Sequence, residues 1–269
     1  MQKRAGFTLI ELLVVIAIIA VLMSILMPAL SKVKLQAQDA VDKNNQHQFA
    51  LIWKFWTDEH EGFFPERGGG SVWGEEKMGA WPFVLYSYLP SISPDIYKCP
   101  AATKPWIEGG RWPYAAWTCD QGGKRVDGSY TCNYWVAKPS DDDDDDQLGK
   151  FWATPAVRGA SFVPLLMCAN WKDSEPEPDD APPPSKEWIQ QNGWEPNANE
   201  MKRVCHYRHG NFVNANMLDL SAKAIGLKEL WITRWHRKWP KGCDHMPDWA
   251  NEAPWMVDMP DPCILWSSP

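Results

Sequence analysis

Motifs that usually mark an enzyme are missing from this chain of 269 residues. It contains no Gly-x-Ser-x-Gly element, no phosphate-binding loop and no His-Glu-x-x-His motif, each of which places reactive groups at a spacing that its chemistry requires. The adjacent Cys205 and His206 do not make a local catalytic pair, because neighbouring residues of a strand point to opposite faces. The sequence therefore predicts a protein that is not an enzyme, with no catalytic residue.

An excess of positive charge is also missing. The net charge is -7 and the isoelectric point is near 5.4, whereas a protein that binds nucleic acid needs a basic face for the phosphates. We therefore expect no nucleic-acid partner. Basic residues do gather in one region near the carboxyl end, and a solvated surface patch is the favoured interpretation of this group: Lys228, Arg234, His236, Arg237, Lys238 and Lys241.

The seven cysteines show no Cys-x-x-Cys spacing. Their dispersal argues against a zinc site made of thiolates, so we predict no metal and no cofactor. In an exported domain some cysteines can form disulfides, and the odd number leaves at least one unpaired. Cys119 and Cys132 flank two turn signals, Gly122-Gly123 and Asp127-Gly128. They are the candidate disulfide, although the sequence does not determine the connectivity.

A long apolar segment is present at the amino terminus. Residues 7–30 are apolar with three exceptions: Thr8, Glu11 and Ser24. As a helix they would extend about 36 Å, which exceeds the roughly 30 Å of a bilayer core. Lys3 and Arg4 precede the segment. Positive charge on a short leader predicts that this end stays cytoplasmic and that the remainder is exported.

Two general explanations account for this segment incompletely. A secretory signal peptide has a shorter apolar region followed by a small-x-small cleavage site, whereas this run continues through Pro28 into a polar helix. A plain membrane anchor explains the length but not Glu11, because a carboxylate in a membrane helix costs a few kcal/mol unless it is paired or interfacial. Glu11 is therefore a candidate functional residue, with an interfacial carboxylate that reaches the headgroups as the alternative.

Residues 4–22 read RAGFTLIELLVVIAIIAVL and resemble the class III signal segment of type IV prepilins and type II secretion pseudopilins. The resemblance implies that a membrane prepilin peptidase cleaves between Gly6 and Phe7 and that Phe7 is then N-methylated. It also implies that Glu11 corresponds to the glutamate of the family, and Pro28 to its helix-perturbing proline. Pro28 removes a backbone donor and is expected to kink the helix.

The resemblance implies a structural subunit of a secretion or surface filament. Glu11 of an incoming subunit would pair with the Phe7 amine of its neighbour and set the register, because either charge alone in an apolar core is costly. The implied partners are the prepilin peptidase, other pilin or pseudopilin subunits, an inner-membrane assembly platform with a cytoplasmic ATPase, and membrane lipid. The precursor would be a single-pass inner-membrane protein with a periplasmic head, later part of a filament or the cell surface.

The expected fold is α+β, with a long amino-terminal helix packed on a small antiparallel sheet with long loops, as in pilins. Residues 1–6 would be the leader, 7–30 the membrane and filament-core helix, 31–60 its amphipathic continuation and 61–269 the head. Helical spacing after Pro28 predicts one apolar stripe toward the head, formed by Leu30, Val33, Ala37, Val41, Leu51, Ile52 and Phe55.

Within the head, residues 81–89 are expected to form a short helix, 130–136 a strand and 163–168 a buried strand. Two acidic segments are expected to be mobile. Residues 141–146 repel one another, and the proline-rich residues 173–184 should form an extended linker. Either segment could bind Ca²⁺, but a solvated acidic loop is the favoured interpretation because the spacing matches no calcium-binding loop.

His209 and Asp219 have nine residues between them, which is similar to the H-x9-D-G element of a pseudopilin-like family abundant in planctomycetes and related bacteria. There the element is a strand, a glycine turn and a second strand. This chain has Leu220 in place of the glycine. We interpret His209 and Asp219 as a hydrogen-bonded structural pair across a hairpin, with a metal or catalytic site as the alternative.

The abundance of tryptophan, 18 residues, suggests an alternative function. Exposed indoles stack on sugars or cations, so the chain could be a membrane-tethered, polysaccharide-binding or adhesion head on a pilin-type anchor. A solvent-exposed row of indoles would distinguish this function from core packing. The candidates are Trp112, Trp117, Trp135, Trp152, Trp231, Trp235, Trp239, Trp249, Trp255 and Trp266.

Overall fold

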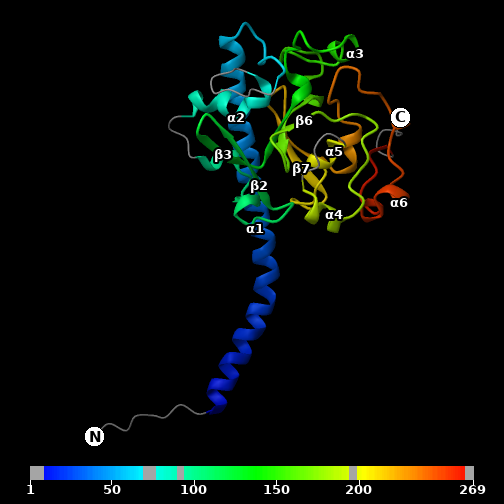
Figure 1. The fold of residues 1–269 in the computed structure, drawn as a ribbon. Coiled ribbons are helices and arrows are strands. Elements are labelled where there is room, and N and C mark those ends of the chain that lie inside the picture. Colours follow the sequence, from blue (N-terminus) through cyan, green and yellow to red (C-terminus); the bar gives the residue numbers. More distant parts are fainter. Residues whose placement is uncertain (1–8, 69–76, 90–93, 194–198, 264–269) are drawn as a thin grey trace.

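The first element of the chain is one very long helix, α1, which runs from Leu9 to Glu59 over 51 residues. The computed structural model describes residues 9–68, 77–89, 94–193 and 199–263. The lower half of α1 extends from the head as a stem, and the upper half lies against the head (Figure 1). The predicted α+β layout, with a long amino-terminal helix followed by sheets, is confirmed.

The head contains two small sheets. The larger has five strands in the order β6-β4-β5-β7-β8: β6 (Asp173–Ser174), β4 (Tyr130–Asn133), β5 (Pro164–Cys168), β7 (Phe212–Met217) and β8 (Ala222–Gly226). Neighbouring strands of this sheet are antiparallel, except that β4 and β6 are parallel. The smaller sheet has the order β1-β2-β3: β1 (Lys104–Pro105), β2 (Ala115–Gln121) and β3 (Lys124–Gly128).

Short helices and turns connect the strands. The α-helices are α2 (Trp81–Val84), α3 (Asp145–Leu148), α4 (Lys186–Gln191), α5 (Met201–Val204) and α6 (Trp249–Glu252). The 3₁₀ turns span Met78–Ala80, Leu85–Tyr88, Pro94–Tyr97, Trp106–Glu108, Tyr134–Val136, Ala160–Phe162, Lys228–Trp231 and Pro254–Met256.

The helix predicted over 81–89 and the buried strand predicted over 163–168 are confirmed. The strand predicted over 130–136 ends at Asn133 instead. The Asn133 side chain accepts a hydrogen bond from the Trp135 amide, and this local cap turns the backbone into a 3₁₀ helix.

The face of α1 that contacts the head differs from the predicted apolar stripe. Its buried residues are Asp42, Gln46, Phe49, Ala50, Ile52, Trp53, Trp56 and Thr57. Of the predicted stripe only Ile52 is buried, and Phe55 is 58% exposed. The prediction counted apolar residues alone, whereas the buried face carries large aromatic rings together with Asp42 and Gln46, which find hydrogen-bond partners inside the head.

Aromatic rings from α1 join the core of the head. Phe49 contacts Trp81, Tyr97 and Tyr130 with ring centroids 5.1 to 6.2 Å apart. Trp53 lies edge-on to Phe64 at 5.6 Å. Such rings bury large apolar areas, so the upper half of α1 is part of the head's core.

The two acidic segments are integrated into the head, contrary to the prediction of a mobile loop and a linker. Asp143 is buried and pairs with Arg67, which also binds Glu175 at 2.8 Å. Glu177 pairs with Lys150 at 2.7 Å. Basic side chains pair with several of these carboxylates, which reduces the repulsion on which the prediction rested.

The proposed disulfide between Cys119 and Cys132 is wrong. Both are free thiols, because Cys119 lies on β2 of the smaller sheet and Cys132 on β4 of the larger one. A disulfide joins Cys243 and Cys263 instead. Five cysteines remain free, and all but Cys119 are buried.

Two aromatic residues on opposite sides of one turn of α1 test which face of the helix supports the head. Trp53 is 1% exposed and Phe55 is 58% exposed. We expect Trp53→Ala to lower the free energy of unfolding by about 3–5 kcal/mol, and Phe55→Ala to change it by less than about 0.5 kcal/mol. Denaturant titration of the full chain in detergent measures both. Equal effects would contradict the assigned packing face.

Candidate functional site

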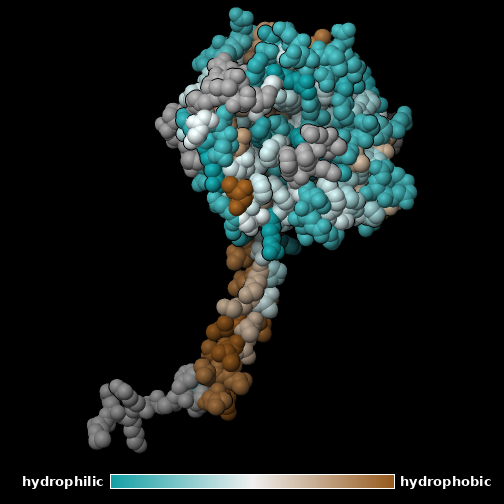
Figure 2. Space-filling view, viewed as in Figure 1, coloured by the Kyte–Doolittle hydropathy of each residue, from teal (hydrophilic) through white to brown (hydrophobic). Residues whose placement is uncertain are grey.

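The lower half of α1 is an exposed apolar stem. Its large hydrophobic residues from Leu9 to Met27 are between 45% and 79% exposed. Figure 2 shows hydrophobic residues covering this part of the molecule, while the visible face of the head is mostly hydrophilic. The helix is long and apolar enough to cross a membrane, and none of its most apolar window is buried. An exposed apolar surface of this size marks a contact with lipid or with another protein.

The residues proposed for processing lie outside the described residues, which begin at Leu9, so the structure does not place Gly6 or Phe7. Glu11 lies in the first turn of α1. The helix continues without a break through Pro28, and the stem curves below the head (Figure 1). The hydroxyl groups of Ser24 and Ser31 donate to the carbonyls of Val21 and Met27, a type of bond that often bends helices.

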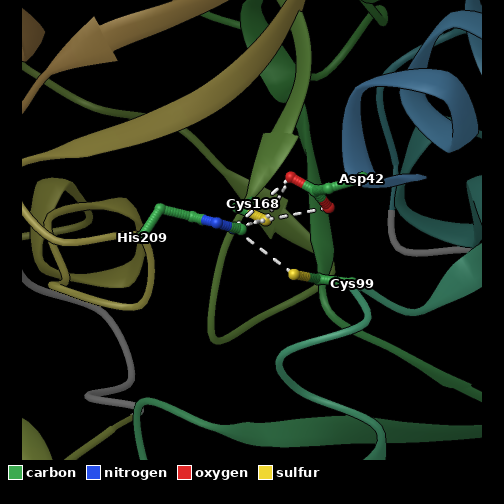
Figure 3. Close-up of side chains that lie close together, drawn as sticks. All are labelled: Asp42, Cys99, Cys168 and His209. Carbon is green, nitrogen blue, oxygen red and sulfur yellow. Dashed lines mark hydrogen bonds and ion pairs between the residues drawn. The ribbon is translucent and has the colours of Figure 1, made fainter. Parts of the chain in front are cut away.

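A second candidate site lies where the upper half of α1 meets the head. Four side chains point toward one another there (Figure 3). They are Asp42 of α1, Cys99 after the turn Pro94–Tyr97, Cys168 at the end of β5 and His209 before β7. Their ligand atoms all lie within 4.8 Å of one another. Asp42, Cys99 and Cys168 are fully buried, and the His209 side chain is 5% exposed.

The distances in this cluster are short and similar. The Nε2 atom of His209 lies 3.3 Å from the sulfur of Cys99 and 3.3 Å from that of Cys168. It is 3.4 Å from Oδ2 of Asp42. The Cys168 sulfur is 3.3 Å from the same oxygen. One nitrogen, two sulfurs and one oxygen thus surround a common centre.

A second ring of polar groups holds Asp42 in place. The Tyr130 hydroxyl donates to Oδ1 at 2.7 Å, and the Asn214 amide donates to Oδ2 at 2.7 Å. The Gln46 amide donates to Oδ2 at 3.3 Å. On the far side of the imidazole, Nδ1 of His209 faces the Asp39 carboxylate at 3.9 Å.

Arg208 brings a positive charge to the same region. Its guanidinium is buried and donates to the carbonyl oxygens of Pro113, Ser129 and Ala169 at 2.7 to 3.2 Å. It also donates to the side-chain oxygen of Asn170 at 3.1 Å. These acceptors are neutral, so the charge of Arg208 is available to balance negative groups in the cluster.

Burial and mutual contact shift the acid–base behaviour of the cluster. Burial raises the pKa of Asp42 to about 7, and the nearby Cys99 adds to this effect. Burial likewise raises the pKa of Cys168. Burial opposes ionisation of Cys99 as well, but hydrogen bonds with Cys168 and His209 lower its pKa well below the usual value. Contact with Cys99 outweighs burial and raises the pKa of His209.

The dispersal of the cysteines along the chain does not exclude a zinc site, because residues 42, 99, 168 and 209 meet in space. Among the described residues this cluster is the group of donors close enough to hold a metal ion, and neither acidic segment contributes to it. Sequence reasoning singled out only His209. The other three carry no local signal, since their partners lie at least 40 residues away along the chain.

The proposed pair of His209 and Asp219 is not formed. His209 approaches Asp42, whereas Asp219 accepts hydrogen bonds from the amide and hydroxyl of Ser221. Within the described ranges no hydrogen bond or ion pair joins the two. The turn after Asp219 nevertheless forms without glycine, because Leu220 adopts the left-handed conformation at φ 69°.

The tryptophans and the basic group serve mainly in packing. Of the ten candidate indoles, six are buried: Trp117, Trp135, Trp152, Trp231, Trp235 and Trp239. Trp112, Trp249 and Trp255 are partly buried against the core, and Trp266 lies outside the described residues. In the part of the chain that is described, these residues form no exposed row. The basic group is not a wholly solvated patch either, since Lys228 and His236 are buried.

Comparison with known proteins identifies the amino-terminal segment. Residues 1–27 match the family described as the prokaryotic N-terminal methylation motif. The match covers the amino-terminal segment alone, and the long helix followed by two sheets gives the chain a pilin-like layout. No curated protein and no solved structure matches the chain.

The left-handed turn at Leu220 can be tested by substitution. A β-branched residue is strongly disfavoured at positive φ, whereas glycine adopts it freely. We expect Leu220→Val to lower the free energy of unfolding by about 1–2 kcal/mol. Leu220→Gly should be at least as stable as the parent. Denaturant titration of the three proteins checks this order, and the reverse order would contradict the turn.

Proposed function

We propose that this chain is a structural subunit of a secretion or surface filament, processed by a prepilin peptidase and assembled through α1. The observation that carries the proposal is the methylation motif over residues 1–27, at the start of a helix whose lower half is apolar and exposed. A structural subunit needs no catalytic residue, and the proposed role includes none.

In this proposal the exposed stem lies first in the membrane and then in the core of the filament. Before assembly, residues 7–30 span the inner membrane, with the leader 1–6 in the cytoplasm and the head in the periplasm. After cleavage between Gly6 and Phe7, the same apolar surface packs against the stems of neighbouring subunits. The assembly platform and its cytoplasmic ATPase would move the subunit from lipid to filament.

Glu11 and the Phe7 amine would set the register in the filament core. Glu11 lies on the exposed stem, two residues after the first described residue of α1. A carboxylate surrounded by apolar stems is costly unless a positive charge lies beside it. The methylated amine of Phe7 on a neighbouring subunit is basic and supplies that charge.

The polysaccharide-binding alternative has less support. Exposed, aligned indoles would favour it, but the candidate tryptophans within the described residues are mostly buried in the head. Their burial explains the abundance of tryptophan through core packing. A filament subunit with an aromatic core is therefore the function that we propose.

Mass spectrometry of the amino terminus tests the processing step. In cells that contain the prepilin peptidase, the mature chain should begin with N-methylated Phe7. In matched cells without the peptidase, the chain should keep residues 1–6. A mature chain that retains Met1 in the presence of the enzyme would contradict the proposal, and so would a soluble head from which the whole stem has been removed.

Substitution of Glu11 tests the assembly step separately. We expect Glu11→Ala to be cleaved normally but to be absent from filaments, because the amine of the neighbouring subunit would lose its partner. Glu11→Asp keeps the charge and serves as the matched control, with partial incorporation expected. Immunoblotting of sheared filaments and of membranes measures both. Normal incorporation of Glu11→Ala would remove the ion pair from the proposal.

A further inference from the structure

We infer that Asp42, Cys99, Cys168 and His209 bind a structural zinc ion that ties the stem helix to the head. Two sulfurs, one imidazole nitrogen and one carboxylate oxygen are ligands that Zn²⁺ accepts in closed, four-coordinate sites. The four residues come from α1, a loop, β5 and the segment before β7. No sequence motif joins them, so the fold alone creates the site.

The spacing of the donors fits a tetrahedral ion. With a zinc–sulfur bond of about 2.3 Å and bonds of about 2.1 Å to nitrogen and oxygen, a sulfur lies about 3.6 Å from a nitrogen or oxygen ligand. The nitrogen lies about 3.4 Å from the oxygen. The observed distances are 3.3 Å from each sulfur to Nε2 of His209 and 3.3 Å from Cys168 to Oδ2 of Asp42. The nitrogen-to-oxygen distance is 3.4 Å.

The charges also balance around a divalent cation. Two thiolates and one carboxylate carry three negative charges, which a zinc ion reduces to one, and the buried guanidinium of Arg208 compensates the remainder. Binding would release the thiol protons to solvent. Without a metal ion, the Asp42 carboxylate and the two sulfurs are buried together with His209 and Arg208 as their basic neighbours.

The surrounding groups are those expected around a metal site. Ligands are usually oriented by hydrogen bonds from a second layer of residues. Here Tyr130 and Asn214 fix the Asp42 carboxylate at 2.7 Å each. The Asp39 carboxylate faces Nδ1 of His209, the ring nitrogen that the ion would leave free.

The site lies beside a pocket and has no open coordination position. A pocket of about 400 Å³ lies between stem and head, and Asp39 and His209 form part of its wall. Of the four donors, His209 is the one that lines this pocket, and the two cysteines lie behind it. Because the protein supplies all four ligands, the ion would be structural rather than catalytic. It would hold together four segments that are distant in sequence, and it would stabilise only the folded head.

Oxidation of Cys99 and Cys168 to a disulfide is the competing chemistry, since the chain already contains the disulfide Cys243–Cys263. The geometry favours metal binding. Both sulfurs approach the same imidazole nitrogen at 3.3 Å, and both cysteines are free. Coordination to zinc would also protect the two thiolates from oxidation.

Elemental analysis of the full chain tests the site. The protein is purified in detergent without chelators, incubated with Zn²⁺ and then freed of unbound ion. The parent protein should contain about one zinc ion per chain. Cys168→Ala should contain at least about tenfold less. Cys205→Ala is the matched control, because Cys205 is equally buried and lies near Met256 instead of the cluster. It should keep the zinc.

Cobalt substitution of the parent protein tests the geometry without any variant, so the result does not depend on whether Cys168→Ala folds. Co²⁺ should give the intense visible bands of a tetrahedral site together with thiolate-to-cobalt charge transfer. Any of three results would overturn the inference: a parent protein without stoichiometric zinc, equal zinc in all three proteins, or a Cys99–Cys168 disulfide found by peptide mass analysis.

Discussion

The structure depends on one helix that belongs to two environments. The upper half of α1 places Phe49, Trp53 and Trp56 in the aromatic core of the head, where each is nearly inaccessible. The lower half leaves its apolar residues exposed, and such a surface marks a contact with lipid or with another protein. Because both halves form one continuous helix, the position of the head follows directly from the position of the stem.

The polar centre of the head lies on the same helix. Asp42 is buried one turn below Gln46, and both find partners on the five-stranded sheet. A carboxylate at this position would be costly without compensation. It meets a histidine and two thiols, so a buried carboxylate lies at the place where stem and head are joined.

Patterns among neighbouring residues correctly predicted the elements whose formation depends on neighbouring residues. The apolar run after Arg4 predicted a long helix at the amino terminus, and the short apolar run ending at Cys168 predicted a buried strand. Predictions failed where the outcome depended on partners elsewhere in the chain. Asp143 and Glu175 were expected in mobile acidic segments, but both bind Arg67. Cys119 and Cys132 flank a turn, but they lie in different sheets.

The sequence by itself determined the prepilin-type segment, the stem and the α+β character of the head, because composition and spacing over neighbouring residues specify these features. Only the tertiary structure decided which face of α1 is buried and which residues meet Asp42. Cys99, Cys168 and His209 come together through strand pairing and helix packing. Those contacts join positions far apart in the chain, and no local pattern specifies them.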